Sequence, residues 1–303
     1  MHTKPIIRDN RRRAMSGKRL FGLLVVFLFV SHSQAEAQQL DVRYDPSTPG
    51  VVARMLRMAN VTADDLVYDL GCGDGRIVIA AAREYGARGV GIDIDPVRIS
   101  EAKDNAKKEV VTGKVRFIEQ NLFEADIDKA TVVTLFLLPS VNLRLRPKLF
   151  RELEPGTRIV SHEHWMGDWK PDQTEDFRAD GRSHTVHLWI LPANVSGTWE
   201  WTGRTDTGKR RYSLGLDQEF QAVYGKLSSD GANITISEMT LEGDRLRFVI
   251  EEETGNEKVI RTFDGTADGN SIKGTVESTT DNGVTKKRWR AKRDTATIDP
   301  LDK

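Results

Sequence analysis

The sequence predicts an α/β domain built on a doubly wound, mostly parallel sheet, followed by a small all-β barrel or sandwich. Three observations support this prediction. Between about residues 44 and 192, apolar runs of strand length alternate with helical patterns, as in βαβ units. A glycine-rich turn at 71–75 lies between the first of these runs and a helical pattern. After Pro192 the apolar period shortens to two, and residues 195–303 hold 12 of the 25 glycines but one proline, Pro300.

The composition is that of a globular protein. The chain has 303 residues, 38% of them hydrophobic and 30% charged, a length that favours two domains. Lys+Arg and Asp+Glu number 45 each, so the formal net charge is zero and we expect no polyanionic partner and no nucleic acid. The single cysteine, Cys72, excludes an intramolecular disulfide and a multi-cysteine zinc site.

Residues 1–37 are expected to form a signal peptide. Basic residues precede the apolar run Leu20–Val30, and small residues that suit cleavage follow at 33–37. The run has 11 residues, fewer than the roughly 20 that a membrane-spanning helix needs. We therefore expect a periplasmic or secreted protein with no stable membrane span after cleavage of the leader. An uncleaved membrane anchor is the alternative.

The first domain, 38–193, is expected to contain six strands and four helices. The strands are predicted at Leu66–Leu70, Gly89–Asp93, Val115–Glu119, Thr131–Phe136, Arg158–His162 and His184–Leu191. The helices are predicted at Pro49–Ala59, Gly75–Tyr85, Pro96–Lys108 and Ser140–Leu153. In the second helix, the small side chains of Ala80–Ala82 permit close packing against the sheet.

The second domain, 195–294, is expected to be an antiparallel meander of seven or eight short strands. Apolar residues alternate with polar ones, and glycine-containing tips at Gly231, Gly243 and Gly269 predict hairpin turns. Closure into a barrel or sandwich would remove exposed strand edges. The domain has no His or Cys, so we expect it to hold a partner or ligand rather than to catalyse. Residues 295–303 are expected to be a frayed tail.

The glycine-rich turn is the most informative motif in the chain. It contains Asp69, Gly71, Gly73, Asp74 and Gly75. These glycines permit positive φ angles and close approach of a ligand to the backbone, and the helix that follows presents free N–H groups. A dinucleotide fingerprint requires glycine where Arg76 stands, and two carboxylates would repel a pyrophosphate but suit a ligand with an ammonium and a sulfonium. An NAD-dependent oxidoreductase is therefore only the alternative.

Two more candidate binding segments follow the next two predicted strands. Asp93, with Ile94 beside it, ends the second strand, and its carboxylate can accept hydrogen bonds from ribose hydroxyls. Asn121 follows the third strand and can reach an adenine amine, while Leu122 can pack on the ring. All three segments lie at carboxyl ends of strands, so we expect them to line one crevice.

These motifs resemble those of the class I S-adenosylmethionine-dependent methyltransferases over residues 44–192, which implies a Rossmann-like fold. The stretch from Asp69 to Val78, the Pro-Ser-Thr-Pro49 segment and Leu138-Pro139 are similar to bacterial relatives of the mitochondrial lysine methyltransferases that act on the ATP synthase c-subunit and the adenine nucleotide translocase. The resemblance implies S-adenosyl-L-methionine as cofactor. It assigns Asp69 and the 71–75 loop to the methionine portion, Asp93 to the ribose, and Asn121 with Leu122 to the adenine.

Methyl transfer needs alignment of the acceptor more than acid-base chemistry, because the sulfonium is already activated. A lysine acceptor must lose its proton before it attacks. The candidate catalytic residues are Pro139, after the fourth strand, and His162, after the fifth, as a base. The acceptor itself is expected to be an unknown protein or small molecule. A non-catalytic cofactor-binding or scaffold protein of the cell envelope is the alternative of a different class.

Side chains next to His162 suggest two further roles. His162 and His164 are expected on one face of the strand, with Glu163 on the opposite face, and we predict no metal there. Trp165 and Trp169 are candidates for the wall of an acceptor pocket, although packing over the sheet edge is the favoured interpretation.

Overall fold

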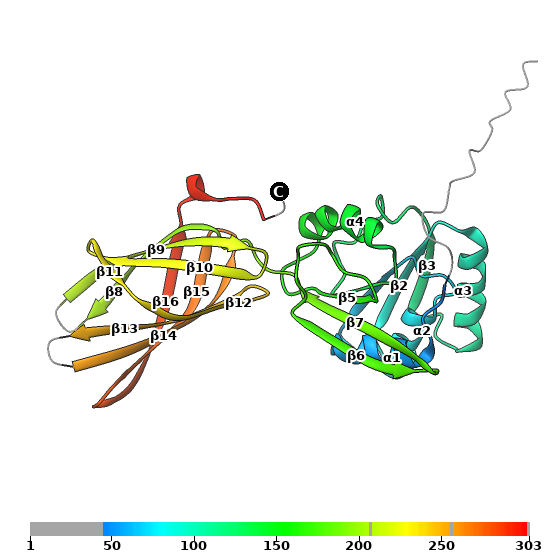
Figure 1. Ribbon diagram of the computed structural model, residues 1–303, viewed down its shortest axis with the longest axis horizontal. Helices are drawn as coiled ribbons and strands as arrows, with labels where there is room; N and C mark the ends of the chain where they lie inside the picture. The colour runs from blue at the N-terminus through cyan, green and yellow to red at the C-terminus, as the bar shows by residue number, and fades with distance from the viewer. Residues whose placement is uncertain (1–44, 206–207, 255–256, 302–303) are drawn as a thin grey trace, which may run out of the picture. The chain divides into compact units, whose positions relative to one another are not determined.

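A computed structural model describes residues 45–205, 208–254 and 257–301. The predicted signal peptide lies outside these residues. Within them, no helix combines the length and the apolar character that crossing a bilayer requires. Two sheets dominate the described part of the chain, and each is considered by itself (Figure 1).

The first sheet has seven strands in the order β3-β2-β1-β4-β5-β7-β6. The strands are β1 (Leu66–Leu70), β2 (Arg88–Asp93), β3 (Val115–Glu119), β4 (Val132–Leu135), β5 (Arg158–His162), β6 (Gln173–Ala179) and β7 (Arg182–Ile190). The helices are α1 (Pro49–Met58), α2 (Arg76–Glu84), α3 (Pro96–Lys108) and α4 (Pro139–Glu152). Strands β1 to β5 pair in parallel, whereas β7 pairs antiparallel with both β5 and β6. The carboxyl ends of five strands therefore share one edge.

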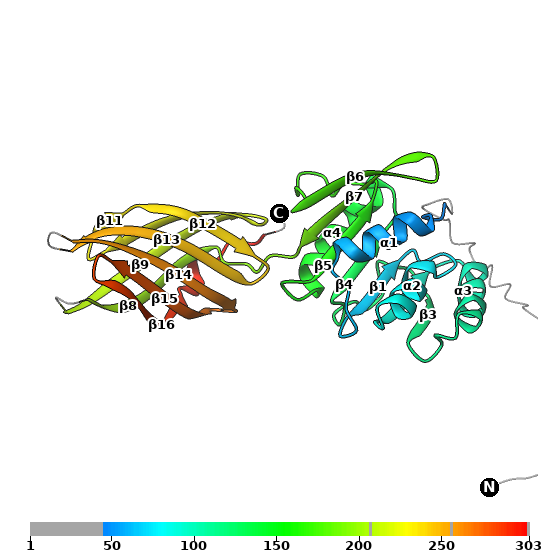
Figure 2. The ribbon, with the colours of Figure 1, turned by 90° about the horizontal axis from the view of Figure 1, so that it is seen from below.

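Helices cover both faces of this sheet, which confirms the doubly wound prediction. Val67 of β1 packs in a core with α1 and α2, and the next residue, Tyr68, packs in a second core with α4. Val132 and Val133 of β4 divide in the same way. Such near-continuous apolar strands are typical of parallel sheets buried on both faces. Figures 1 and 2 show α4 on one side of the sheet and α1 and α2 on the other.

The predicted helices and strands of this domain are confirmed, with their ends shifted by two residues at most. Strand β6 is missing from the prediction. Phe177 is its one large apolar residue, so the sequence shows no alternation there. The signal lies in the turn instead, because Asp180 and Gly181 adopt φ angles of 51° and 78°, as in the two-residue turns that join hairpin strands.

The second sheet has nine antiparallel strands instead of the expected seven or eight. They are β8 (Gly197–Thr205), β9 (Gly208–Glu219), β10 (Ala222–Ser229), β11 (Ala232–Ile234), β12 (Ile236–Glu242), β13 (Arg245–Thr254), β14 (Glu257–Asp268), β15 (Ser271–Thr280) and β16 (Gly283–Arg293). Their order is β11-β10-β9-β8-β16-β15-β14-β13-β12. The two edge strands, β11 and β12, are consecutive in the chain and separated by Thr235 alone. The sheet therefore curls into a nearly closed barrel.

An aromatic core fills this barrel-like sheet. The rings of Phe248 and Phe263 stack at 4.6 Å between centroids, and Trp289 contacts both edge-on. The predicted turns at Gly231, Gly243 and Gly269 are confirmed as hairpin turns. The expected frayed tail is wrong for residues 295–299. Residues Thr295–Thr297 form a short 3-10 helix. The carbonyl of Asp299 accepts a hydrogen bond from the side-chain amide of Asn194 at 2.7 Å.

Candidate functional site

The glycine-rich turn joins β1 to α2 in a backbone conformation that only glycine adopts without strain. The φ angles are 86° at Gly71, 51° at Gly73 and 79° at Gly75. A Cβ at Gly75 would lie 2.5 Å from the ring of Phe117, and one at Gly71 would lie 2.8 Å from Leu137. Both backbone shape and space therefore require glycine in the turn.

Asp93 at the end of β2 is hydrogen-bonded to this turn. One carboxylate oxygen accepts the backbone N–H of Gly73 at 2.8 Å, and the other accepts the N–H of Asp95 at 3.0 Å. A carboxylate offers about four lone-pair positions. Asp93 therefore keeps capacity for hydroxyl donors, as a ribose would supply, while it fixes the turn beside it.

Asp69 lies fully within the protein at the end of β1. Its side chain accepts a hydrogen bond from the Thr134 hydroxyl at 2.8 Å. Burial raises the pKa of Asp69 to about 7, the neighbouring carboxylates of Asp93 and Asp74 add to this, and the Thr134 bond opposes it. A buried carboxylate with acidic neighbours gains stability from a cationic ligand. This fits the ammonium that the sequence motif predicts in the methionine portion.

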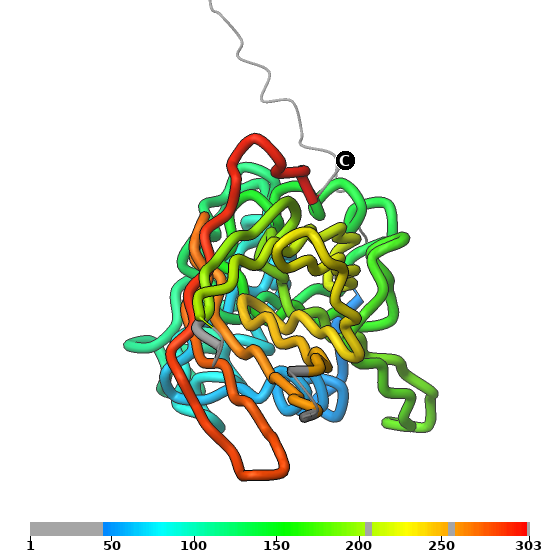
Figure 3. Tube along the Cα trace, turned by 90° about the vertical axis from the view of Figure 1, so that its left-hand side faces the viewer, coloured from blue at the N-terminus to red at the C-terminus, as the bar shows by residue number. Residues whose placement is uncertain are grey.

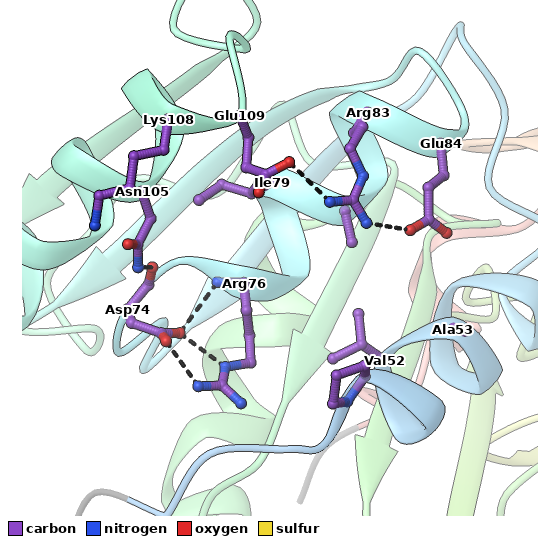
Figure 4. A pocket seen from close by; sticks show the side chains of 12 residues that line it. Val52, Ala53, Asp74, Arg76, Ile79, Arg83, Glu84, Asn105, Lys108 and Glu109 are labelled. Carbon is purple, nitrogen blue, oxygen red and sulfur yellow. Dashed lines mark hydrogen bonds and ion pairs between the residues drawn. The ribbon is translucent and has the colours of Figure 1, made fainter.

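Asp74 faces a different part of the domain. Its carboxylate forms two hydrogen bonds with the Arg76 guanidinium, at 2.8 and 2.7 Å. Both side chains line a pocket of about 370 Å³ between α1, α2 and α3 (Figure 4). Arg83 in this pocket forms ion pairs with both Glu84 and Glu109. Of the predicted cofactor residues, Asp74 is the one that lines this pocket.

The third predicted segment follows β3 and lies next to the Asp93 segment. The backbone N–H of Gln120 donates to the carbonyl of Asp93 at 2.9 Å. The Asn121 side chain accepts the N–H of Phe123 at 3.0 Å and so shapes the loop, and Leu122 is half-buried against the second core. Ile94 is also half-buried. The carboxyl edges of β1, β2 and β3 thus carry the predicted residues side by side, as the sequence predicts.

A cluster of titratable side chains lies beyond β5 on the same edge of the sheet. His162 Nε2 is 3.1 Å from His184 Nδ1, and a Glu163 carboxylate oxygen is 3.3 Å from each of these nitrogens. The other ring nitrogen of His162 contacts the Ser47 hydroxyl at 3.0 Å. Neither His184 nor Ser47 is among the site residues predicted from the sequence, because they reach the cluster from β7 and from the segment before α1.

The expected position of Glu163 opposite His162 is wrong. Glu163 adopts a φ of 65°, a left-handed conformation that is rare for residues other than glycine. This breaks the alternation of the strand and brings the carboxylate to the side of the two histidines. Strained residues of this kind concentrate at functional sites. Donor atoms of the three side chains lie within 4.8 Å of one another, a set that could hold a metal ion; the sequence pattern predicts none, and that stays a prediction.

His162 is neutral rather than cationic near pH 7. Burial lowers the pKa of His162 to about 4, with Glu163 opposing the shift. The Phe136 ring packs against the His162 ring at 4.1 Å between centroids. Pro139 begins α4 three residues later and is exposed. His162 and Phe136 are therefore in contact at the ends of β5 and β4, and Pro139 follows Phe136 in the chain.

The two tryptophans have different positions. Trp169 is fully buried and packs against Trp189 and Phe150 in the second core, so it cannot form the wall of an open acceptor pocket. Trp165 is 51% exposed and lies edge-on to His187. Only Trp165, of this pair, remains a candidate for contact with an acceptor.

Comparison with known protein families gives a match over this site. A family described as the ANTKMT methyltransferase domain matches residues 69–173. The matched segment begins at Asp69 and includes the turn, the Asp93 segment and the histidine that ends β5. It therefore covers the whole carboxyl edge described above apart from His184 and Ser47.

Relatives of this chain include a protein-lysine N-methyltransferase of Saccharolobus islandicus, 48% identical over 151 residues that cover 50% of this chain and 94% of the relative. The ATP synthase c-subunit lysine N-methyltransferase of Homo sapiens is 33% identical over 127 residues, 42% of this chain and 54% of its own length. The chain thus spans about half of the human relative. A solved structure titled as an RNA methyltransferase from Salinibacter ruber with S-adenosyl-L-homocysteine is 54% identical, with a TM-score of 0.48, over 50% of this chain and 96% of that one.

Proposed function

The chain belongs to the ANTKMT methyltransferase family, and from this premise we propose that it transfers a methyl group from S-adenosylmethionine to a lysine amine of a protein. The observation that carries the proposal is the buried Asp69, next to a turn whose N–H is held by Asp93. This arrangement favours a cationic ligand with ribose hydroxyls. The lysine acceptor is inferred from the similar lysine methyltransferases of Saccharolobus islandicus and Homo sapiens.

The proposed cofactor site runs along β1, β2 and β3. Asp69 and the turn from Gly71 to Gly75 hold the methionine portion, and Asp93 with Ile94 holds the ribose. Asn121 and Leu122 hold the adenine. Asp74 belongs to this set through its backbone, since its carboxylate is engaged by Arg76.

The proposed reaction is a direct displacement. The lone pair of a neutral lysine nitrogen attacks the methyl carbon, the carbon–sulfur bond breaks, and S-adenosylhomocysteine leaves. Aligned reactants and excluded water supply most of the acceleration. Pro139, whose ring fixes the start of α4, and the adjacent Phe136 are proposed to guide the acceptor chain toward the sulfonium.

His162 and Glu163 are proposed to take the acceptor's proton. Glu163 is the most exposed of the clustered side chains, at 35%, and its carboxylate attracts a lysine ammonium. His162 is neutral, so it adds no competing positive charge, and its Nε2 is in contact with His184 Nδ1. The proton passes through the pair of His162 and His184 to the Glu163 carboxylate and then to solvent.

We further propose that the protein is exported, on the basis of the apolar run Leu20–Val30 behind basic residues. Edman sequencing of the protein from the periplasmic fraction tests this, with cleavage near residue 37 as the expected result. A protein that retains its N-terminus in the cytosolic fraction would contradict export. An exported enzyme also requires a supply of S-adenosylmethionine outside the cytosol.

Transfer of radiolabelled methyl from S-adenosylmethionine to an envelope extract tests the proposed activity. We expect label on protein, in methyl-lysine after hydrolysis. Calorimetric binding of S-adenosylhomocysteine without any transfer would favour a scaffold protein. Binding of NAD in place of S-adenosylhomocysteine would favour an oxidoreductase.

A further inference from the structure

The hairpin of β15 and β16 has a strongly basic outer face. Trp289 and Ala291 of β16 are buried in the barrel core, so the alternate residues of this strand point outward. The basic face is defined by Lys273, Lys286, Arg288, Arg290 and Lys292, all of which are exposed. The hairpin, orange-red in Figure 3, extends past the neighbouring strands at its tip.

The strand register places like charges together on this face. Arg290 is directly opposite Lys273, a cross-strand pair of equal sign that costs free energy. Lys286 is opposite Glu277, and Lys292 is opposite Glu200 of β8. Acidic residues therefore stand opposite the two ends of the row, whereas Arg288 and Arg290 at its centre have no acidic residue opposite them on β15.

The cations of the neighbouring strands behave differently. Arg245 pairs with Asp264 at 2.5 Å, Arg247 with Glu238 at 3.4 Å, and Lys258 with Glu251 at 2.7 Å. The cations of the basic face form no such ion pairs: in the described part of the chain, no carboxylate oxygen lies within 4.0 Å of their side-chain nitrogens. The uncompensated charge is thus concentrated on one face, although the net charge of the chain is zero.

We propose that the basic face binds the anionic headgroups of a phospholipid bilayer. Alternate residues of a strand lie about 6.6 Å apart, so the four cations of β16 form a row about 20 Å long that can contact a membrane surface. Val284, 61% exposed on the same side of the strand near the tip, can contact the lipid interface. The export proposed above from the apolar run Leu20–Val30 would also bring the chain next to a bilayer.

A single-stranded nucleic acid fits this face less well. Proteins that bind single strands without sequence preference combine basic grooves with aromatic rings on which the bases stack. Trp289, the aromatic residue of β16, is 3% exposed and directed into the barrel. Phosphates of a lipid surface need only the charges.

Cosedimentation with vesicles tests the proposal, with residues 39–303, which form a compact unit without the leader. The probe is phosphatidylcholine vesicles with and without phosphatidylglycerol. We expect binding to the anionic vesicles alone, and weaker binding as salt screens the charges. The variant Arg288→Gln/Arg290→Gln should bind about 25-fold more weakly, since each cation near an anionic surface contributes about fivefold.

The matched control is Arg245→Gln/Arg247→Gln, which removes the same net charge from paired positions in the same domain. We expect it to change vesicle binding by less than threefold, roughly the screened effect of distant charges. Circular dichroism and the Tm establish that both variants fold, and the salt dependence of the wild type tests the proposal without any variant. Absence of binding to anionic vesicles at low salt would overturn it. Equal losses of binding in both variants, or tighter binding of single-stranded RNA at the same salt, would also overturn it. Aggregation of the Arg288→Gln/Arg290→Gln variant with vesicle binding intact would overturn it too, and would show that the charges protect a strand edge.

Discussion

The carboxylate of Asp93 accepts the backbone N–H of Gly73 at 2.8 Å and so joins the ends of β1 and β2. The two residues belong to different motifs, and the bond makes the glycine turn and the candidate ribose site one unit. Because the second oxygen of Asp93 is held by the N–H of Asp95, the carboxylate has a fixed orientation before any ligand binds. Preorganisation of this kind lowers the entropic cost of binding.

Asp93→Ala is expected to weaken binding of S-adenosylhomocysteine by on the order of 10- to 100-fold, the value of one charge-assisted hydrogen bond or slightly more. The loss has two sources, the missing ribose acceptor and the freed Gly73 amide. Isothermal titration calorimetry measures it. The matched control is Asp104→Ala, an exposed carboxylate on α3, which should leave the affinity unchanged. Equal affinities for wild type and Asp93→Ala would remove Asp93 from the site.

Gly75→Ala is expected to lower the free energy of unfolding by about 2 kcal/mol or more, because a Cβ in the left-handed region costs about 1–2 kcal/mol before any clash with Phe117 is added. Urea denaturation measures the change. Gly113→Ala serves as the control, since nothing lies within 4 Å of its added Cβ. A Gly75→Ala protein as stable as this control would show that the turn tolerates side chains.

Asp69→Asn is expected to stabilise the ligand-free protein above pH 7 by a few kcal/mol, an order-of-magnitude figure, while it weakens cofactor binding. Since the folded-state pKa of Asp69 is raised from 3.8 to about 7, the wild type loses stability as pH rises across that window, and the neutral amide does not. Urea titrations from pH 4 to 8 measure this. The two proteins should converge near pH 4, where both side chains are neutral. A difference that stays constant across the range would contradict the pKa assignment.

Glu163→Gln is expected to lower kcat/KM for methyl transfer by about 10- to 100-fold, in the range that general acid-base groups supply, and to leave the affinity for S-adenosylhomocysteine unchanged. The amide keeps the shape of the cluster but loses the charge that attracts the lysine ammonium. Radiometric assays at varied acceptor concentration measure it, with the exposed Glu154→Gln as control. Loss of cofactor affinity in Glu163→Gln would argue against a role at the acceptor.

A chelator separates this role from a metal site at the same residues. If His162, Glu163 and His184 act without a metal, prolonged treatment with EDTA leaves methyl transfer and the Tm unchanged. A loss of either that zinc restores would instead assign the cluster to a metal.

His162→Gln is expected to reduce the acid sensitivity of the fold. The folded-state pKa of His162 lies at about 4, below its ordinary value of 6.5, because burial disfavours the imidazolium. Stability that depends on neutral His162 is therefore present above pH 6.5 and is lost as pH falls toward 4. The Tm measured between pH 7 and 4 should fall less steeply in the variant. Burial also lowers the pKa of His187, so part of the slope should remain; an unchanged slope would show that His162 is not the buried group.

Much of the fold could be predicted because local patterns and packing agree. The central strands β1, β4 and β5 place apolar residues in both cores, and the helix before β2 begins directly after a turn that requires glycine. The same physics predicts the candidate cofactor site, since parallel strands bring their carboxyl ends to one edge. Strand β6 could not be found by alternation, because Phe177 is its one large apolar residue, and the Asp180-Gly181 turn joins it to its partner β7.

The histidine cluster shows where sequence reasoning stops. Neighbouring residues of a regular strand point to opposite faces, which placed Glu163 away from His162. A positive φ at Glu163 reverses this, and nothing in the local sequence signals it. His184 and Ser47 join from segments that are distant in the chain.

The sequence by itself determined the alternation of strands and helices, the glycine turn with its flanking carboxylates, and the all-β character of the second domain, because these depend on periodicity and on local backbone sterics. Tertiary structure decided that Asp93 accepts the hydrogen bond from the turn, that Asp69 is buried, and that Asp74 pairs with Arg76. It also decided that five cations gather on one face of a hairpin, although the net charge of the chain is zero. The direction, burial and clustering of side chains arise from contacts between segments that are distant in the chain, so they cannot be predicted from local sequence patterns.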